Sequence, residues 1–311
     1  MQALEIGWRT TLTEGIASGA PRQVIDAGGS VASSVTHAID LLSVPPREIA
    51  IDQATLESAA DHARQLALAD PRLACSIMAV VDATVRADSR APARMQAESA
   101  FQLAWTANNW VQPDMAEQAV TRAANLYQEL NDRQMAAACQ WLINDLPWTR
   151  HSFKAAVKSL RKAEAVLAEG HLDEYLWECR LALVYGLLLT QQYEEAKHLL
   201  DRAEAAIMDM DKWRLRARLR LSQVSYLRRV QEPGQVLEVA HGLLQEVLAG
   251  HAPLYQGQAH FLMARVHLAS TQMEESQPYI DRALAIFRRH QAPLWEAMTL
   301  TCQIDVHNDL S

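Results

Sequence analysis

The chain contains many residues of the types that bind metal ions or act as nucleophiles, but their spacing assembles no site. Among its eleven histidines, His260 and His267 lie seven positions apart, which is about 10 Å along a helix and too far for one metal ion. Its four cysteines occur singly, without the C-x-x-C spacing of metal or redox sites. We therefore expect no metal, no cofactor and no catalysis. Isolated cysteines are typical of a reducing compartment, so we expect a cytoplasmic protein.

The most strongly charged stretch is KWRLRARLRLSQVSYLRR, residues 212–229, which carries seven basic residues and no acidic one. Guanidinium groups in such a segment can bind a phosphate or a carboxylate. Four closely spaced arginines are the candidates for this role: Arg214, Arg216, Arg218 and Arg220. On a helix, however, the charges divide into two stripes. We therefore favour the interpretation that this helix is solvated and pairs with acidic neighbours: Glu194, Glu195, Asp201 and Glu204.

Composition argues against several classes of protein. The formal net charge is −8, so a nucleic-acid partner is not expected. No apolar stretch approaches the roughly 20 residues that span a bilayer, and the first residues lack the basic and apolar regions of a secretory signal. Half of the residues are hydrophobic, while Gly and Pro number only 11 each. This composition predicts an all-α protein without a membrane partner.

Helical segments follow one another from Asp52 to Asn308, separated by short breaks. Asp52 and the Asp70-Pro71 pair have the residue types that begin helices. Two prolines at 45 and 46 end any preceding helix, and residues 1–50 do not share the pattern that follows. We therefore predict two parts, an N-terminal helical cap at 1–50 and a helical repeat array at 52–311.

A spacing of forty residues organises the array. A small residue recurs at this spacing: Ser76, Ala116, Ala156 and Ala196. A large residue follows four positions later and an alanine seven positions later, so that small residues let helices approach and large ones fill the space beside them. The small residue then reappears after 44 positions at Ala240 and after 36 at Ser276. We interpret this change as a shift that lengthens one hairpin beside the basic segment.

This order of residues resembles the tetratricopeptide repeat. In that family a small residue also stands twelve positions earlier, in the first helix of each hairpin. Ala104 and Ala264 fit this rule, whereas Asn144, Val184 and Arg228 depart from it. The family's usual period is about 34 residues, so units of forty resemble the longer repeats of large bacterial proteins, including maltose-activator-like regulators and proteins with a C-terminal CHAT protease. The resemblance implies a right-handed α-solenoid of about six hairpins, followed by a last unpaired helix at 293–308.

In such a solenoid the first helix of each hairpin lines the concave face. The register places these aromatic and basic residues there: Phe101, Trp105, Trp141, Trp148, Tyr185, Tyr226 and Arg265. Tryptophans at 105, 110, 141 and 148 form the densest aromatic patch, our candidate for the centre of a binding groove. The alternative is that about half of these side chains pack between repeats. The sequence alone leaves both interpretations open.

These features predict a non-enzymatic adaptor that binds a peptide or protein partner in its concave groove. The alternative is a sensor module that binds a small ligand or signalling peptide and controls a protease or transcriptional output. The CHAT resemblance also draws attention to His241 and Cys302, which follow the order of the catalytic pair in those proteases. Both residues fall inside predicted helices, whereas that protease fold places its pair on loops after strands. We therefore expect no catalytic pair here.

Overall fold

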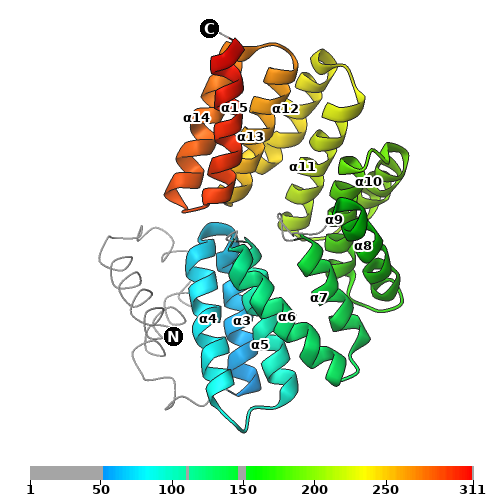
Figure 1. The fold of residues 1–311 in the computed structure, drawn as a ribbon, viewed down its shortest axis with the longest axis vertical. Helices are drawn as coiled ribbons and strands as arrows, with labels where there is room; N and C mark the ends of the chain where they lie inside the picture. Colours follow the sequence, from blue (N-terminus) through cyan, green and yellow to red (C-terminus); the bar gives the residue numbers. More distant parts are fainter. Residues whose placement is uncertain (1–51, 110–111, 146–151, 310–311) are drawn as a thin grey trace.

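The computed structural model describes residues 52–109, 112–145 and 152–309. Within these ranges the chain forms thirteen α-helices and no strand (Figure 1), so the all-α prediction is confirmed. The helices are α3 (Gln53–Ala69), α4 (Pro71–Ala87), α5 (Ala93–Asn109), α6 (Pro113–Glu129), α7 (Arg133–Asp145), α8 (Phe153–Leu167), α9 (Asp173–Leu189), α10 (Tyr193–Ile207), α11 (Trp213–Val230), α12 (Pro233–Ala249), α13 (Pro253–Ala269), α14 (Met273–Arg289) and α15 (Pro293–Asp309). The predicted cap at residues 1–50 lies outside the described residues.

Successive helices pair into hairpins, from α3 with α4 to α13 with α14, and α15 follows as the last helix. Each helix contacts the next along the chain. The odd-numbered helices also contact one another in series, from α3 and α5 to α13 and α15. The odd-numbered helices therefore form one layer of a helical solenoid, and the even-numbered helices form the other.

The helix starts and turns explain why the hairpins are alike. Asp52 caps α3 by accepting the Thr55 backbone N–H at 2.8 Å. Four turns contain a residue with φ between 52° and 61°, two positions before the next helix: Asn131, Gln191, Thr271 and Gln291. A left-handed residue after a helix lets the turn bond back to the last carbonyls. Accordingly, the Gln192 N–H donates to the Leu187 carbonyl at 2.9 Å.

The helix boundaries keep the forty-residue spacing where the sequence indicated a shift. α12 begins at Pro233, forty residues after α10 begins at Tyr193 and forty before α14 begins at Met273. The predicted lengthening of this hairpin is therefore wrong. Val236 is buried where the preceding unit has its small residue, and Ala240 is buried where that unit has its large one. A large and a small residue have exchanged places, which conserves core volume.

The constant forty-residue spacing also changes the repeat position of Arg228. With the boundaries forty residues apart, the residue of α11 that corresponds to Ala104 is Val224. Val224 is fully buried, as Ala104 is, whereas Arg228 is only half-buried. Arg228 therefore does not occupy a core position of the repeat.

The array curves so strongly that its C-terminal part returns toward its start (Figure 1). Helix α13 contacts α3, although 183 residues lie between the end of α3 at Ala69 and the start of α13 at Pro253. The odd-numbered helices consequently face one another across a narrow interior. We call their surface toward this interior the inner face.

Candidate functional site on the inner face

Side chains of the inner face reach between helices that are several repeats apart. Arg64 of α3 donates to the Tyr175 hydroxyl of α9 at 3.3 Å. Arg214 of α11 donates to Asn109 Oδ1 of α5 at 3.2 Å. Because these bonds cross the interior, the first helices of the hairpins line the concave side, as the resemblance implied.

Three of the predicted partner-binding aromatics take part in this internal packing. Phe101 and Trp141 are fully buried against Tyr175, with ring centroids 5.4 and 5.9 Å from its ring. Trp105 is also buried, and the Arg214 guanidinium lies 4.7 Å from its ring centroid. A partner would reach these three rings only by separating the inner helices. Their role in partner binding stays a prediction.

Two tryptophans of the predicted aromatic patch have no structural description. Trp110 and Trp148 lie outside the described residues. Of the four tryptophans proposed as the centre of a binding groove, the structure describes those at positions 105 and 141, and both rings are buried.

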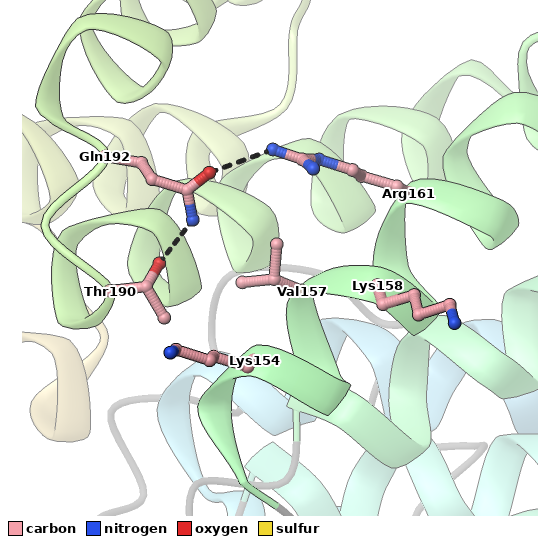
Figure 2. Close-up of a pocket in the computed structure, with 6 residues that line it drawn as sticks. All are labelled: Lys154, Val157, Lys158, Arg161, Thr190 and Gln192. Atoms are coloured by element: carbon pink, nitrogen blue, oxygen red, sulfur yellow. Dashed lines mark hydrogen bonds between the residues drawn. The ribbon is translucent and has the colours of Figure 1, made fainter.

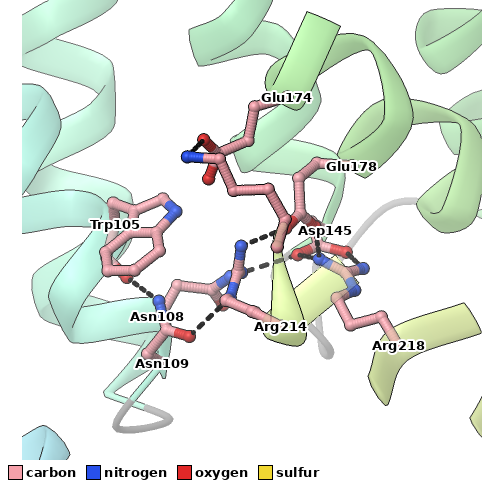
Figure 3. Close-up of polar contacts among 9 residues, drawn as sticks. Trp105, Asn108, Asn109, Asp145, Glu174, Glu178, Arg214 and Arg218 are labelled. Atoms are coloured by element: carbon pink, nitrogen blue, oxygen red, sulfur yellow. Dashed lines mark hydrogen bonds and ion pairs between the residues drawn. The ribbon is translucent and has the colours of Figure 1, made fainter. Parts of the chain in front are cut away.

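Next to Trp105, four ionisable side chains form what we call the inner salt-bridge cluster: Asp145, Glu178, Arg214 and Arg218 (Figure 3). Glu178 is 1% exposed and accepts hydrogen bonds from both arginines, from Arg218 at 2.5 Å. Arg218 also donates both terminal nitrogens to Asp145, at 2.6 and 3.0 Å. The cluster thus ties α7, α9 and α11 together at the centre of the inner face.

The charges of this cluster compensate one another. Burial opposes the charge of Arg218, but Asp145 and Glu178 outweigh burial and hold its pKa above the ordinary arginine value. Burial likewise opposes the charge of Arg214, and Glu178 raises its pKa. Both guanidinium groups are therefore committed to carboxylates of the chain itself. They join helices and do not offer a free site for an anion.

The other two candidate arginines lie on the second stripe of α11. Arg216 and Arg220 each pair with Glu246 of α12 at 3.2 Å, and Arg220 also pairs with Glu204 of α10 at 2.8 Å. The predicted pairing with Glu204 is therefore confirmed. The other contacts differ from prediction, since Glu195 pairs with Arg161 and Asp201 with Lys197.

The description of this helix as solvated is wrong for its inner stripe. Arg214 is buried, and the side chain of Arg218 is 17% exposed. Their carboxylate partners come from α7 and α9, which precede the acidic segment that the sequence indicated. Sequence proximity favoured α10, whereas the curvature of the array brings α7 close to α11.

The inner face is more open in the second half of the array. Tyr185 of α9 is 47% exposed, and Tyr226 of α11 and Arg265 of α13 are half-buried. Two further arginines, Arg228 and Arg229, lie in the last turn of α11. Burial and then the charge of Arg265 lower the pKa of both. These groups therefore lie close together, in a part of the inner face that solvent reaches.

Arg228 and Arg229 were not among the candidate residues from sequence. The available signal was their position in the basic segment, because seven uncharged residues separate Arg220 from Arg228. That gap is about two helical turns, or roughly 10 Å. It places the last two arginines beside different neighbours from the first four.

A shallow hollow of about 340 Å³ lies in the outer layer, between α8 and the turn that joins α9 to α10 (Figure 2). Its lining consists of Lys154, Val157, Lys158, Arg161, Thr190 and Gln192. Arg161 already donates to Gln192 at 3.1 Å and pairs with Glu195 at 2.5 Å. Both lysines are exposed. We therefore regard this hollow as outer surface and not as the functional site.

The potentially reactive side chains do not form a catalytic arrangement among the residues that the structure describes. All four cysteines are buried and form no disulfide, and burial raises the pKa of Cys75 to about 12, far from that of a reactive thiol. His241 lies on α12, with its ring centroid 6.2 Å from those of His267 and Tyr279. Cys302 lies on α15, so His241 and Cys302 both lie on helices, as the sequence predicted.

The described residues contain no group of three His, Cys, Asp or Glu side chains that could hold a metal ion. Of the helices that the structure describes, none combines the length and the apolar character required to cross a bilayer.

No protein-family model and no curated protein sequence matches the chain. Among solved structures, the chain is similar to the one described as "Crystal Structure of Rap Protein Complexed with Competence and Sporulation Factor". The TM-score is 0.56, and the alignment covers 87% of this chain and 79% of the Rap protein chain. The sequence identity is 8%, so the likeness concerns the fold alone. It confirms the helical solenoid that the repeat spacing predicted.

Proposed function

We propose that this chain is a non-enzymatic adaptor that binds a peptide or protein partner on the inner face of its C-terminal half. The observation that carries the proposal is a difference in exposure: Tyr185 is 47% exposed, whereas Phe101 and Trp141 are fully buried. An exposed aromatic ring on a concave surface is the kind of residue that anchors a partner. Tyr226 and Arg265 extend the accessible surface beside it.

Two further findings support this proposal. The Rap protein, which shares the fold, was crystallised in complex with Competence and Sporulation Factor. The odd-numbered helices begin every forty residues from Gln53 to Pro293, which favours assignment to the long tetratricopeptide repeats of bacterial proteins. Buried cysteines without disulfides agree with the cytoplasm as the proposed location.

The test is to select binders from a random peptide library displayed on phage and to map them by hydrogen exchange. We expect a bound peptide to protect α9, α11 and α13. Tyr185→Ala is expected to weaken binding roughly tenfold or more. Phe153→Ala is the matched control, because Phe153 is 55% exposed but lies on the outer helix α8. Equal losses in the two variants, or protection confined to even-numbered helices, would contradict the proposal.

A further inference from the structure

Three arginines lie together at the open end of the inner face. Arg228 and Arg229 form part of the last turn of α11, and Arg265 is on the neighbouring α13. We call these three residues the open arginine cluster. All three side chains are half-buried. Burial, followed by the charges of Arg265 and Arg229, lowers the pKa of Arg228 to about 10, so the three positive charges are close enough to repel one another.

The described residues leave the charge of the open arginine cluster uncompensated. Arg229 donates to the Ser225 carbonyl at 2.7 Å, and the Arg265 guanidinium lies 5.6 Å from the Phe261 ring centroid. Nε of Arg228 is buried and has no hydrogen-bond partner there. No described carboxylate pairs with any of the three, whereas Arg214 and Arg218 have Glu178 and Asp145. A partly buried charge without a counter-charge is unfavourable, so an anion would find a favourable site here.

Two exposed hydrophobic side chains lie near this cluster. Tyr185 and Val230 are 47% and 39% exposed, and they belong to the six large hydrophobic side chains with marked exposure among the described residues. Val230 directly follows Arg229 in the chain, and Tyr185 is close enough to Arg228 to act on its charge. A small inorganic anion would leave this apolar surface uncovered. A polypeptide with an acidic group next to an apolar side chain would cover both.

We propose that Arg228, Arg229 and Arg265 bind a carboxylate of an extended polypeptide partner, while Tyr185 and Val230 pack against an apolar side chain next to it. This inference rests on the proposed function, since it assigns the chemistry of the partner on the same face. Guanidinium groups bind carboxylates through paired, charge-assisted hydrogen bonds. The carboxylate has two sources in a polypeptide, an acidic side chain or the free C-terminus.

Three hexapeptides, titrated into the full chain by calorimetry, separate these sources. The first alternates glutamate and leucine and has both ends blocked. The second replaces glutamate by glutamine with both ends blocked, and the third is the glutamine peptide with a free C-terminal carboxylate. We expect the first or the third peptide to bind and the second not to bind. The net charge of −8 disfavours general attraction of acidic peptides, so binding requires a local site.

Arginine variants then locate the binding. Arg265→Gln and Arg228→Gln are each expected to weaken binding roughly tenfold or more. Arg90→Gln is the matched control, because the Arg90 side chain is 84% exposed and distant in the chain from this cluster. Unchanged affinity in the cluster variants, no binding of either carboxylate peptide, or binding of inorganic phosphate alone would each overturn the inference. If the inference failed in this way, a phage-selected peptide whose binding is weakened by Tyr185→Ala would still support the proposed function.

The sign of a stability change provides a second measurement that needs no ligand. Arg228→Gln is expected to raise the melting temperature of the free protein by roughly 2–4 °C, because it removes an uncompensated charge. A fall in melting temperature would mean that the chain itself already supplies a counter-charge to Arg228. That outcome would overturn the proposal that the cluster awaits a partner's carboxylate.

Discussion

The two ends of α11 hold arginines in opposite electrostatic situations. At its N-terminal end, Arg214 and Arg218 converge on Glu178, and Arg218 also binds Asp145 (Figure 3). At its C-terminal end, the charges that lower the pKa of Arg228, after burial, are those of two other arginines, Arg265 and Arg229. Both ends belong to one basic stretch of sequence. The difference arises from the neighbouring helices, because α7 and α9 bring carboxylates to one end and α13 brings a third arginine to the other.

This difference separates a region that holds the array together from a region suited to a partner. Around Glu178, inner side chains from α5, α7, α9 and α11 fill the interior with one another. Around Arg228, Tyr185 stays 47% exposed, and no carboxylate among the described residues pairs with the arginines. Four stability measurements test this difference between the two ends of α11, and their expected effects decrease in the order given.

The largest effect is expected for Glu178→Gln. Glu178 is 1% exposed and is shared by two guanidinium groups, so the variant leaves Arg214 buried without a carboxylate. Breaking a buried ion pair in this way costs about 3–5 kcal/mol. Urea unfolding followed by circular dichroism measures the loss. Glu117→Gln is the control, since Glu117 is exposed and a change within about 0.5 kcal/mol is expected there. A similar, small loss in both variants would refute the structural role of the cluster.

A double-mutant cycle on Asp145 and Arg218 is expected to give the next largest value. Their side chains are 12% and 17% exposed and make two hydrogen bonds. We expect a coupling energy of about 1–3 kcal/mol between Asp145→Asn and Arg218→Met. The reference cycle uses Arg133 and Glu169, which are 3.9 Å apart and largely exposed, and should give a coupling near zero. Equal couplings would show that the bridge between α7 and α11 adds nothing beyond a surface pair.

At the other end of α11, removal of an arginine is expected to stabilise the protein. Burial and the neighbouring Arg265 and Arg229 lower the pKa of Arg228 to about 10, below the ordinary arginine value, so the folded state binds this proton less tightly than the unfolded chain. The charge therefore destabilises the fold fully below about pH 10, and its penalty declines as the pH rises above 10 toward the ordinary arginine pKa. Arg228→Gln should exceed the wild-type stability by about 1 kcal/mol at neutral pH, because solvent partly screens the half-buried charge. Urea unfolding should show this advantage shrinking above pH 10.

The matched variant for this experiment is Arg218→Gln. It removes an arginine from the same helix, but one that has two carboxylate partners, and it should destabilise the protein at neutral pH. If the two variants changed stability in the same direction, the distinction between the ends of α11 would fail.

Much of the fold could be predicted because it depends on local sequence. Asp52 caps α3 as expected, and the small residues at 116 and 196 are fully buried. The error in the register has a physical cause. Val236 and Ala240 place a large residue before a small one, the reverse of Ala196 and Leu200 in the preceding unit. The small residue is therefore shifted by about one helical turn, while the helix boundaries keep their spacing.

The site was harder to predict because it depends on curvature. Tyr175 bonds to Arg64 and packs between Phe101 and Trp141, which buries two residues expected to bind a partner. The bond between Arg64 and Tyr175 joins α3 to α9, which lie three repeats apart. The repeat pattern assigns positions within one repeat, so it does not show which distant repeats come together. Tyr185 and Arg265 lie farther along the array and remain accessible, since no ring of the described residues stacks on them across the interior.

The smallest effect is expected for Arg161→Gln, which tests whether burial distinguishes the ion pairs of this protein. Arg161 and Glu195 are 2.5 Å apart, the same distance as Arg218 and Glu178. Their side chains, however, are 47% and 43% exposed, so water already solvates both charges. We expect Arg161→Gln to change the free energy of unfolding by no more than about 0.5 kcal/mol. Because the distance is matched, a loss as large as that of Glu178→Gln would show that proximity alone governs these pairs, and the contrast between buried and exposed charge would no longer explain the inner face.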